Sequence, residues 1–585
     1  MLVTFTLFGG QLVRLQAFDA STLATAGLKS RLDTVIVPAL RGSIVASDGV
    51  ELAKSIDRVN VTADQQAVRE YTKRGVKVGV AGAAADLSPL LGIPVDKLAT
   101  MLTGDRRFVY LAKDVSPLIW RTINKLGVNG ILSEHAPERV YPTGAAASAL
   151  VGWVAADGRA VRGNGGGLEL LYNSRLEGTP GTERYEISRD GRVIPTGEQQ
   201  VTPAVPGRTV RLTVDSDLQW YAQNAVARKV LDTKAQSGAI VVMEVKTGRL
   251  KAVATYPTFD PTDIGRPTSY LQNRAFGEAF EPGSTAKVMT AAAALQEGVA
   301  TPDTEVTVPN RLPRADKVFQ DSHNHPTEHL TFAGVIAQSS NIGTMLVGEK
   351  VRRAVLERYF RAFGIGAPTG VGFPGETQGV FAPSADWNDS QRYTVMYGQG
   401  LSLNAVQAAG VFQAVANGGL RVPPTLVEGT TSGEGTFTPA PPTTPVRVVS
   451  EQTAKTLSQM LEFVVGDEGT AKQAEVAGYR VAGKTGTADR VGAGGRYDGK
   501  TASFIGFAPA DDPKYVVAVV LQDPVKGYFG GATAGPVFRD VMTYTLQRFG
   551  VPPTGTPAPV MRLRVGEAPV SAGSVQKVTT ARTSR

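Results

Sequence analysis

Three short strings of polar residues stand out in the 585-residue chain, because together they supply the groups that a serine acyl-transferase needs. In chain order they are Ser284-Thr285-Ala286-Lys287, Ser339-Ser340-Asn341 and Lys484-Thr485-Gly486-Thr487. Acyl transfer through serine requires a hydroxyl nucleophile, a group that accepts its proton and a cationic strand that holds a carboxylate. Each string alone is weak evidence, since patterns this short occur by chance. Their order and their local surroundings together predict one active site.

Ser284 and Lys287 are predicted to be the nucleophile and its base. The stretch STAKVMTAAAAL follows Pro282-Gly283 and is apolar on nearly all sides after its first turn, which predicts a helix buried in its domain. The two side chains then share one face of the first turn. Burial without an acid beside it in sequence disfavours the ammonium form of Lys287, and a neutral amine can accept the serine proton. The alternative is a capping serine with an exposed lysine one turn later.

Ser339 and Asn341 follow residues 330–338, which are mostly apolar and predict a short helix that ends in a polar turn. From such a turn both side chains can point into a cleft. There the hydroxyl of Ser339 relays a proton to a leaving amine, and the amide of Asn341 binds a peptide carbonyl. The alternative is an ordinary turn or a helix cap.

The string from Lys484 to Thr487 ends a predicted strand and suits the carboxylate of a substrate. Lys484 supplies a cation, and Thr485 and Thr487 supply hydroxyls, while Gly486 leaves room for a ligand against the backbone. The N–H of Thr487 is predicted to form an oxyanion hole with that of Ser284. The alternative is an edge-strand lysine that discourages aggregation.

The elements around these strings predict an α+β catalytic domain. An early strand is followed by a helix and by two strands in a hairpin, a mostly helical stretch comes next, and three late strands precede a final amphipathic helix. We therefore expect a five-stranded antiparallel sheet flanked by helices, with an all-helical subdomain inserted in the chain. The early elements are expected at residues 209–214, 215–234, 239–245 and 249–256, and the late ones at residues 479–487, 501–507, 515–521 and 534–549.

The chain is too long for one core, so at least two domains are expected. Short strand-like runs alternate with Gly and Pro in residues 12–206, which we interpret as a mostly β, non-catalytic module ahead of a catalytic domain at residues 207–549. Two segments are predicted to be unstructured because they are rich in Thr, Pro or polar residues: a surface loop at residues 430–445 and a tail at residues 550–585.

Composition narrows the function classes. The absence of cysteine excludes disulfides, thiolate catalysis and cysteine-ligated metals. A net charge of +8 is compatible with an anionic partner or with a scattered, solvated excess of positive charge. No Lys/Arg block is interleaved with aromatic residues, so no nucleic-acid partner is predicted.

The amino terminus reads MLVTFTLFGG, which is apolar but too short to cross a bilayer as a helix. It lacks the basic region and the cleavage site of a signal peptide. We expect residues 1–11 to be the outer end of a membrane anchor that starts further upstream. The alternative is a short buried or frayed segment.

Three histidines, at positions 323, 325 and 329, lie in the segment DSHNHPTEH and raise the possibility of a zinc site. Pro326 and the position just ahead of Ser339 favour a loop at the rim of the cleft instead. No metal is predicted.

The region of residues 209–549 resembles the transpeptidase domain that penicillin-binding proteins share with serine β-lactamases, and all three of its motifs are intact. Upstream strings are similar to the non-catalytic, pedestal-type or dimerisation-type module of class B penicillin-binding proteins, and Tyr528-Phe529-Gly530-Gly531 resembles their septal, cell-division type. The upstream strings are Arg41-Gly42-Ser43-Ile44, Arg139-Val140-Tyr141-Pro142, Gly167-Leu168-Glu169 and Leu176-Glu177-Gly178.

The resemblance implies a peptidoglycan D,D-transpeptidase. Ser284 would attack the penultimate D-Ala of a stem peptide, an amine of a neighbouring stem would resolve the acyl-enzyme, and β-lactams would acylate the same serine. No metal or organic cofactor is implied. The implied partners are a membrane-embedded glycan polymerase and division proteins. The resemblance also implies that the protein has a single-pass anchor in the cell membrane, with its catalytic domain outside the cytoplasm.

Three alternatives stay open beside this interpretation. The first is a β-lactamase, in which Glu376 would activate a water molecule, although the class B pattern at residues 373–376 and the long first module favour a structural loop. The second is a non-catalytic penicillin-binding sensor or division scaffold, against which the intact Lys287 and Asn341 argue. The third is a class B transpeptidase of the lateral wall.

Overall fold

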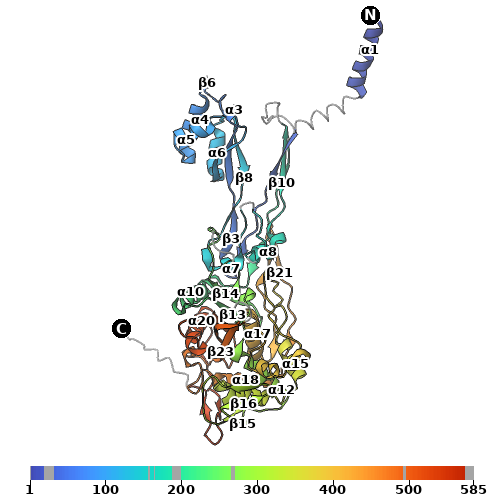
Figure 1. Ribbon diagram of the computed structural model, residues 1–585. Coiled ribbons are helices and arrows are strands. Elements are labelled where there is room, and N and C mark those ends of the chain that lie inside the picture. Colours follow the sequence, from blue (N-terminus) through green and yellow to red (C-terminus); the bar gives the residue numbers. More distant parts are fainter. Residues whose placement is uncertain are drawn as a thin grey trace.

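The computed structural model describes residues 2–18, 32–155, 158–163, 165–186, 199–264, 270–491 and 496–573. The molecule is elongated, with a large catalytic domain at one end and a slender module that carries a small head at the other (Figure 1). This confirms the predicted α+β fold of two modules. The exact domain boundaries stay a prediction.

The catalytic domain is built on a five-stranded antiparallel sheet, as predicted, and its strand order is β14-β13-β25-β24-β23. The strand predicted at residues 479–487 is displaced: it begins at Ala482 and extends to Val491, because its pairing with the neighbouring strand continues past the Lys-Thr-Gly-Thr string. The strands are β13 (Ser237–Glu244), β14 (Leu250–Tyr256), β23 (Ala482–Val491), β24 (Tyr497–Ala508) and β25 (Tyr515–Gln522).

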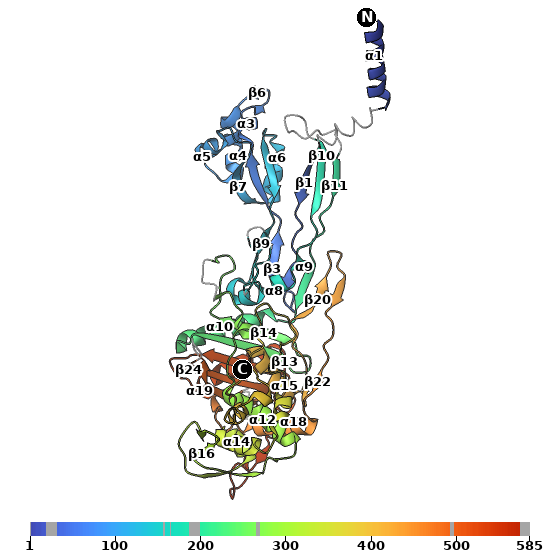
Figure 2. The same cartoon turned by 45° about the vertical axis from the view of Figure 1, so that its right-hand side comes forward.

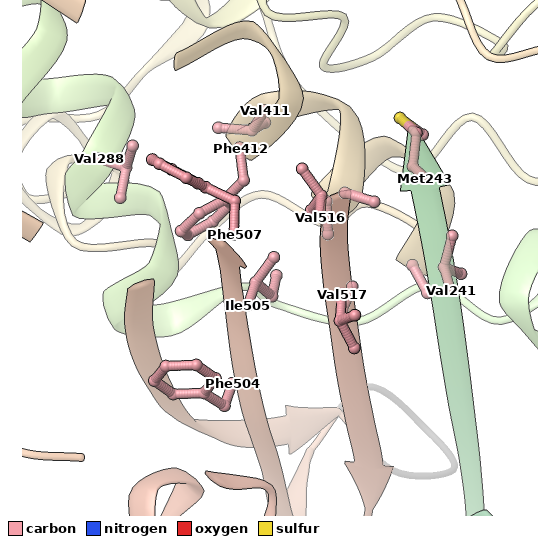
Figure 3. Packing of buried hydrophobic residues seen from close by; sticks show 14 of the residues in the cluster. Val241, Met243, Val288, Val411, Phe412, Phe504, Ile505, Phe507, Val516 and Val517 are labelled. Carbon is pink, nitrogen blue, oxygen red and sulfur yellow. The ribbon is translucent and has the colours of Figure 1, made fainter. Parts of the chain in front are cut away.

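Helices cover both faces of this sheet. On one face α10 (Ser216–Thr233), which Asp215 caps, packs beside α20 (Gly535–Arg548), and Phe538 of α20 contacts Phe504 edge-on with ring centres 4.6 Å apart. On the other face α17 (Ala405–Ala416) packs on β13, β24 and β25, and α18 (Glu451–Glu462) packs on β23 and on α12 (Lys287–Gln296). Figure 3 shows this alternation: Ile505 and Phe507 point toward Phe412 of α17, and Phe504 points away. The catalytic residues are thus set against a closed apolar core.

The middle of the chain is mostly helical, as predicted, and also contains three short strand pairs. The pairs are β15 with β18, β16 with β17, and β19 (Leu420–Arg421) with β22 (Val446–Arg447). The helices are α11 (Arg274–Gly277), α13 (Phe332–Ala337), α14 (Asn341–Gly348), α15 (Arg353–Ala362), α16 (Gln391–Met396) and α18 (Glu451–Glu462), and the strands are β15 (Glu305–Val308), β16 (Arg311–Arg314), β17 (Lys317–Gln320) and β18 (Glu328–Thr331).

A six-stranded sheet joins the first module to the catalytic domain. Its centre is β12, which pairs in parallel with β2 of the first module and antiparallel with β20. In order the strands are β21 (Phe437–Pro439), β20 (Val427–Thr431), β12 (Thr209–Leu212), β2 (Ile44–Val45), β3 (Glu51–Ile56) and β9 (Glu138–Val140). The loop predicted at residues 430–445 is therefore wrong in part, because Thr430 and Thr431 bond to β12 and residues 437–439 pair back onto β20 as a hairpin.

The head has a core of its own, separate from that of the catalytic domain. Beside it a long stalk of strands runs toward the catalytic domain (Figure 2). The head contains β4 (Val59–Ala63), β7 (Val109–Val115), β8 (Ile131–His135), α3 (Gln65–Val68), α4 (Gly79–Leu91), α5 (Val95–Leu102) and α6 (Pro117–Lys125), and the stalk contains β1 (Leu32–Val37), β10 (Gly181–Glu186) and β11 (Gln199–Thr202).

The base of the first module holds a buried cluster of ionic groups. Glu169 is completely buried, and its carboxylate accepts hydrogen bonds from Arg41 Nε at 2.6 Å and from Arg139 Nε at 2.8 Å. Arg139 also donates to the carbonyl of Gly42 at 2.9 Å. One carboxylate therefore holds together three segments that are distant in sequence.

Replacing Glu169 by glutamine is expected to destabilise the first module by about 3–5 kcal/mol, because two buried guanidinium groups lose their counter-charge. Thermal unfolding followed by circular dichroism checks this as a lower midpoint. The matched control is Glu138→Gln, which removes the partly exposed pair with Arg58 and is expected to cost less than about 1 kcal/mol. Equal midpoints for the two variants would contradict the role of the cluster.

The predicted disordered tail is wrong for residues 551–573, which pack on the catalytic domain. Leu563 is buried, its carbonyl accepts a hydrogen bond from Thr331 N at 3.0 Å, and Val565 N donates to His329 O at 2.9 Å. Two short strands, β26 (Val560–Met561) and β27 (Val570–Ser571), close the segment into a hairpin. Backbone pairing with β18 orders this stretch, and a count of its polar residues could not reveal that. Residues 574–585 lie outside the described part of the chain.

The amino-terminal helix α1 (Leu2–Val13) stands apart from the folded modules (Figure 1). Within the described residues, we find no helix with the length and apolar character needed to cross a membrane.

Candidate active site

Ser284 lies where a short 3-10 turn, η4 (Gly283–Ala286), leads into α12. The predicted continuous helix therefore starts later, at Lys287. Gly283 adopts a φ of +52° and donates its N–H to Gly398 O at 3.0 Å, so this glycine sets the sharp entry into the turn. Ser284 itself is half-buried, at the surface of the domain core.

Lys287 is completely buried, as the apolar helix predicts. Its Nζ donates a hydrogen bond to the carbonyl of Ser339 and lies 3.3 Å from Ser339 Oγ. Burial lowers the pKa of Lys287 to about 7, although the negative charge of Asp321 partly opposes this. A substantial fraction of neutral amine is therefore present at neutral pH.

The second string forms the turn between α13 and α14. Ser340 caps α14, since its hydroxyl accepts the N–H of Gly343 at 2.8 Å, and the side-chain amide of Asn341 donates to Gln320 O at 3.2 Å. Ser339 has a φ of +63°, in the left-handed region that non-glycine residues seldom adopt. This strained conformation is what aims both the carbonyl and the hydroxyl of Ser339 at Lys287.

The third string occupies β23, an edge strand of the sheet, but Lys484 is completely buried and so is not a solvent-exposed edge lysine. Burial, and then the nearby Lys287, lower the pKa of Lys484 well below its ordinary value. Its Nζ donates to Thr485 Oγ1 at 3.3 Å. Thr487 Oγ1 accepts the N–H of Gly530 at 3.1 Å, which ties β23 to α19 (Gly530–Thr533).

Close packing brings the three strings to one place. Gly486 lies so near the nucleophile turn that a Cβ there would be 2.9 Å from Pro282 O and 3.1 Å from Thr285 Cγ2. The lysines of the first and third strings influence each other electrostatically, and the first and second strings are hydrogen-bonded. All eight predicted site residues therefore belong to one cluster.

A cavity of about 430 Å³ opens next to the nucleophile turn and includes Glu281, which sequence reasoning missed. Glu281 Oε1 accepts the N–H of Gly400 at 2.9 Å and lies 3.4 Å from the hydroxyl of Tyr497, and burial raises the pKa of its carboxyl group. Arg490 lines the same cavity. A cavity with groups of both signs suits a polar substrate chain.

The histidine segment forms the support of the second string. Asp321, which sequence reasoning did not assign to the site, accepts hydrogen bonds from Ser340 Oγ at 2.7 Å and from His325 Nε2 at 3.2 Å. Among the residues that the structure describes, no group of three or more His, Asp or Glu side chains is placed to hold a metal ion. No local signal identified Asp321, because it lies 18 positions before Ser339 and reaches the string only through the fold.

Glu376 organises its own loop. Its Oε1 accepts the N–H of Thr369 at 2.7 Å, and Phe373 stacks on Phe276 with ring centres 4.4 Å apart. These contacts support the interpretation of residues 373–376 as a structural loop.

The five-stranded sheet, the helical insert and the three clustered strings together define the class of penicillin-recognising transpeptidase domains. Residues 238–543 match the family described as penicillin binding protein transpeptidase domain, and residues 36–212 match the penicillin-binding protein dimerisation domain.

Curated relatives agree with these matches. The chain is 34% identical to the penicillin-binding protein PbpB of Mycolicibacterium smegmatis, over 96% of this chain and 91% of the relative. It is 31% identical to the peptidoglycan D,D-transpeptidase FtsI of Escherichia coli, over 94% of this chain and 91% of the relative.

Solved structures are similar as well. Penicillin-binding protein 3 of Mycobacterium tuberculosis, in complexes with aztreonam and with ampicillin, is 31% identical with a TM-score of 0.70, over 91% of this chain and 100% of the other. The chain therefore belongs to the penicillin-binding protein transpeptidase family, as a class B member of the PbpB and FtsI type, which confirms the resemblance recognised in its sequence.

Proposed function

We propose that this protein is a septal peptidoglycan D,D-transpeptidase that cross-links stem peptides through an acyl-enzyme on Ser284. The observation that carries the proposal is the setting of Lys287, a completely buried amine with a pKa of about 7, held beside the Ser339 hydroxyl. The names of the relatives PbpB and FtsI support the same activity and the septal type.

Acylation begins when neutral Lys287 accepts the proton of Ser284 as its Oγ attacks the carbonyl carbon of the penultimate D-Ala. The bond from that carbon to the nitrogen of the terminal D-Ala then breaks. Ser339 Oγ, 3.3 Å from Lys287 Nζ, relays the proton to the leaving amine. An amine of a neighbouring stem next attacks the ester, and Ser284 recovers its proton as the new peptide bond forms.

Substrate binding uses the other two strings. Lys484, Thr485 and Thr487 receive the terminal carboxylate, and this anion favours the charged form of a lysine whose pKa burial has lowered. Gly486 lets the substrate lie against β23, and the N–H groups of Thr487 and Ser284 stabilise the oxyanion. The amide of Asn341 binds a peptide carbonyl of the donor stem.

β-Lactams are proposed to acylate the same serine. Their strained amide takes the place of the D-Ala-D-Ala bond, and the relative from M. tuberculosis forms complexes with aztreonam and ampicillin. The chemistry uses the side chains of this protein and calls on no metal or organic cofactor.

A membrane location is part of the proposal. The apolar side chains of α1 are unusually exposed for a folded protein, with Phe5 at 75% and Phe8 at 68%. We infer that residues 1–11 belong to a single-pass anchor, with the catalytic domain outside the cytoplasm. A membrane-embedded glycan polymerase and division proteins are the proposed partners.

Cross-linking of lipid-linked peptidoglycan tests the function. With a partner polymerase present, the protein is expected to produce cross-linked dimers of stem peptides, and Ser284→Ala is expected to produce none. Efficient penicillin labelling without cross-linked product would instead favour a sensor or division scaffold.

The rate of acylation by penicillin is expected to rise with pH through about 7 and to level off above it. The reason is that the depressed pKa of Lys287 makes the reactive neutral amine predominant only above that pH. Stopped-flow labelling with a fluorescent penicillin between pH 5 and pH 9 measures the profile. A rate that still rises without an inflection at pH 9, as a lysine with the ordinary pKa of about 10.4 would give, would contradict the assignment of Lys287 as base.

A further inference from the structure

The turn that carries Ser339 rests on a buried carboxylate. Asp321 is 8% exposed and accepts four hydrogen bonds. Its Oδ2 accepts from Ser340 Oγ at 2.7 Å and from His325 Nε2 at 3.2 Å, and its Oδ1 accepts from the backbone N–H groups of Asn341 and of Ile342, the latter at 3.0 Å. One carboxylate thus holds the three residues that directly follow Ser339.

His325 contacts the carboxylate of Asp321. It is 9% exposed, and while its Nε2 faces Asp321, its Nδ1 lies 2.7 Å from the carbonyl oxygen of Pro326. One ring nitrogen therefore contacts the carboxylate of Asp321, and the other contacts the backbone of the loop that carries both residues. The buried ring thus braces Asp321 against its own loop.

Other charged or titratable groups face this pair. Glu328 Oε2 lies 3.8 Å from His325 Nδ1, and Glu328 in turn pairs with Arg564 at 3.5 Å. The ring of His323 lies 5.7 Å from that of His325. Lys287 is within electrostatic reach of Asp321, and Lys484 faces Lys287.

The pair is connected to the reacting groups through Ser339. This serine holds a left-handed φ of +63°, a strained conformation that persists only where the surroundings impose it. Asp321 imposes it by fixing Ser340 and Asn341, and the strained serine then directs its carbonyl and hydroxyl to Lys287. Without the carboxylate, the turn can relax and move the proton relay away from the base.

We propose that Asp321 and His325 are a positioning pair for acylation: Asp321 holds the Ser339 turn against Lys287, and His325 holds Asp321 in place. The inference rests on the proposed acylation of Ser284 and goes beyond it, since neither residue touches the substrate. The negative charge of Asp321 also favours the ammonium form of Lys287.

The experiment compares Asp321→Asn, His325→Gln and Ser340→Ala with a matched control, His323→Gln, which changes an exposed histidine of the same loop. Two quantities are measured for each: the pH profile of penicillin acylation, and the titration of Lys287 by NMR of carbon-13-labelled lysine, assigned with Lys287→Arg.

Asp321→Asn is expected to lower the plateau rate of acylation by about 100-fold, because the proton-relaying hydroxyl of Ser339 is misplaced. It is also expected to move the acid limb of the pH–rate profile and the titration of Lys287 to lower pH, because the negative charge near Lys287 is lost. His325→Gln is expected to lower the rate by about 10-fold, since Asp321 then loses the ring that holds it in place. Ser340→Ala, which removes one of the four donors, is expected to lower the rate without moving the limb. The control is expected to match the wild type.

A Lys287 titration that is the same in Asp321→Asn and in the wild type would overturn the inference, as would a wild-type plateau rate in that variant. A His325→Gln profile identical to the control would remove His325 from the pair. If Asp321→Asn does not fold, His325→Gln and Ser340→Ala decide the question. If the wild type is not acylated at all, the proposed function fails, whereas the Lys287 titration still reports on Asp321.

Discussion

Lys287→Met is expected to reduce the rate of penicillin acylation by about 1000-fold or more, because the thioether has no lone pair basic enough to accept the proton of Ser284. Methionine has nearly the length of lysine, so the helix α12 keeps its packing. The oxyanion donors and the carboxylate-binding strand remain, and reversible binding of penicillin should therefore survive the change.

The same variant is expected to unfold at a temperature equal to or above that of the wild type. A lysine whose pKa falls from 10.5 to about 7 on folding destabilises the fold at neutral pH by about 4 kcal/mol, a penalty that shrinks as pH rises from 7 to 10.5. Methionine removes this penalty, while the loss of the donor to Ser339 O costs about 1–3 kcal/mol. Differential scanning calorimetry near pH 7 measures the midpoint. A lower midpoint, or undiminished acylation, would contradict the role of Lys287.

Gly486→Ala is expected to lower both stability and activity, because the space for a Cβ is already occupied. The added carbon would lie 2.3 Å from Ser503 Oγ and 2.9 Å from Pro282 O, so β23 must move away from the nucleophile turn. Overpacking of this kind costs about 1–3 kcal/mol. A displacement of about 1 Å between Ser284 and the carboxylate-binding strand is expected to slow acylation by about 100-fold.

The control for this change is Gly410→Ala, a buried glycine in the middle of α17 with open space where the Cβ would be placed. Alanine favours the helix by up to about 1 kcal/mol, so a slightly higher unfolding midpoint and an unchanged acylation rate are expected. Fluorescent-penicillin kinetics and thermal unfolding are measured on both variants. Wild-type acylation kinetics for Gly486→Ala would contradict this prediction, because they would mean that β23 accommodates the added Cβ without moving away from Ser284.

Much of the catalytic domain could be predicted from the sequence because its elements carry strong local signals. The apolar strands of the sheet and the amphipathic α10 and α20 were found within a few residues of their observed bounds. The hairpin of β20 and β21 and the segment at residues 551–573 could not be found in this way. Their order comes from backbone pairing with β12 and β18, which a composition rich in Thr and Pro conceals.

The candidate active site could also be predicted only where its residues carry a local sequence signal. The three strings predicted Ser284, Lys287, Ser339, Asn341 and the residues of β23 as site residues from short-range spacing, and the fold brings the strings together, while their roles stay predictions. The argument from the lack of an acid beside Lys287 in sequence was incomplete, since folding brings Asp321 close from a distant loop. The left-handed φ of Ser339 had no local signal either, because contacts from outside its own string impose it.

The packing of residues 560–565 against β18 also has a consequence for the order of biosynthesis. These residues are translated after the entire catalytic sheet, and yet Thr331, which lies eight positions before Ser339, is bonded to Arg562 O and Leu563 O. The contacts of Thr331, which caps α13, are therefore incomplete on the ribosome until this late segment has been made. A nascent chain that already contains the nucleophile, the base and the carboxylate-binding strand still lacks these bonds.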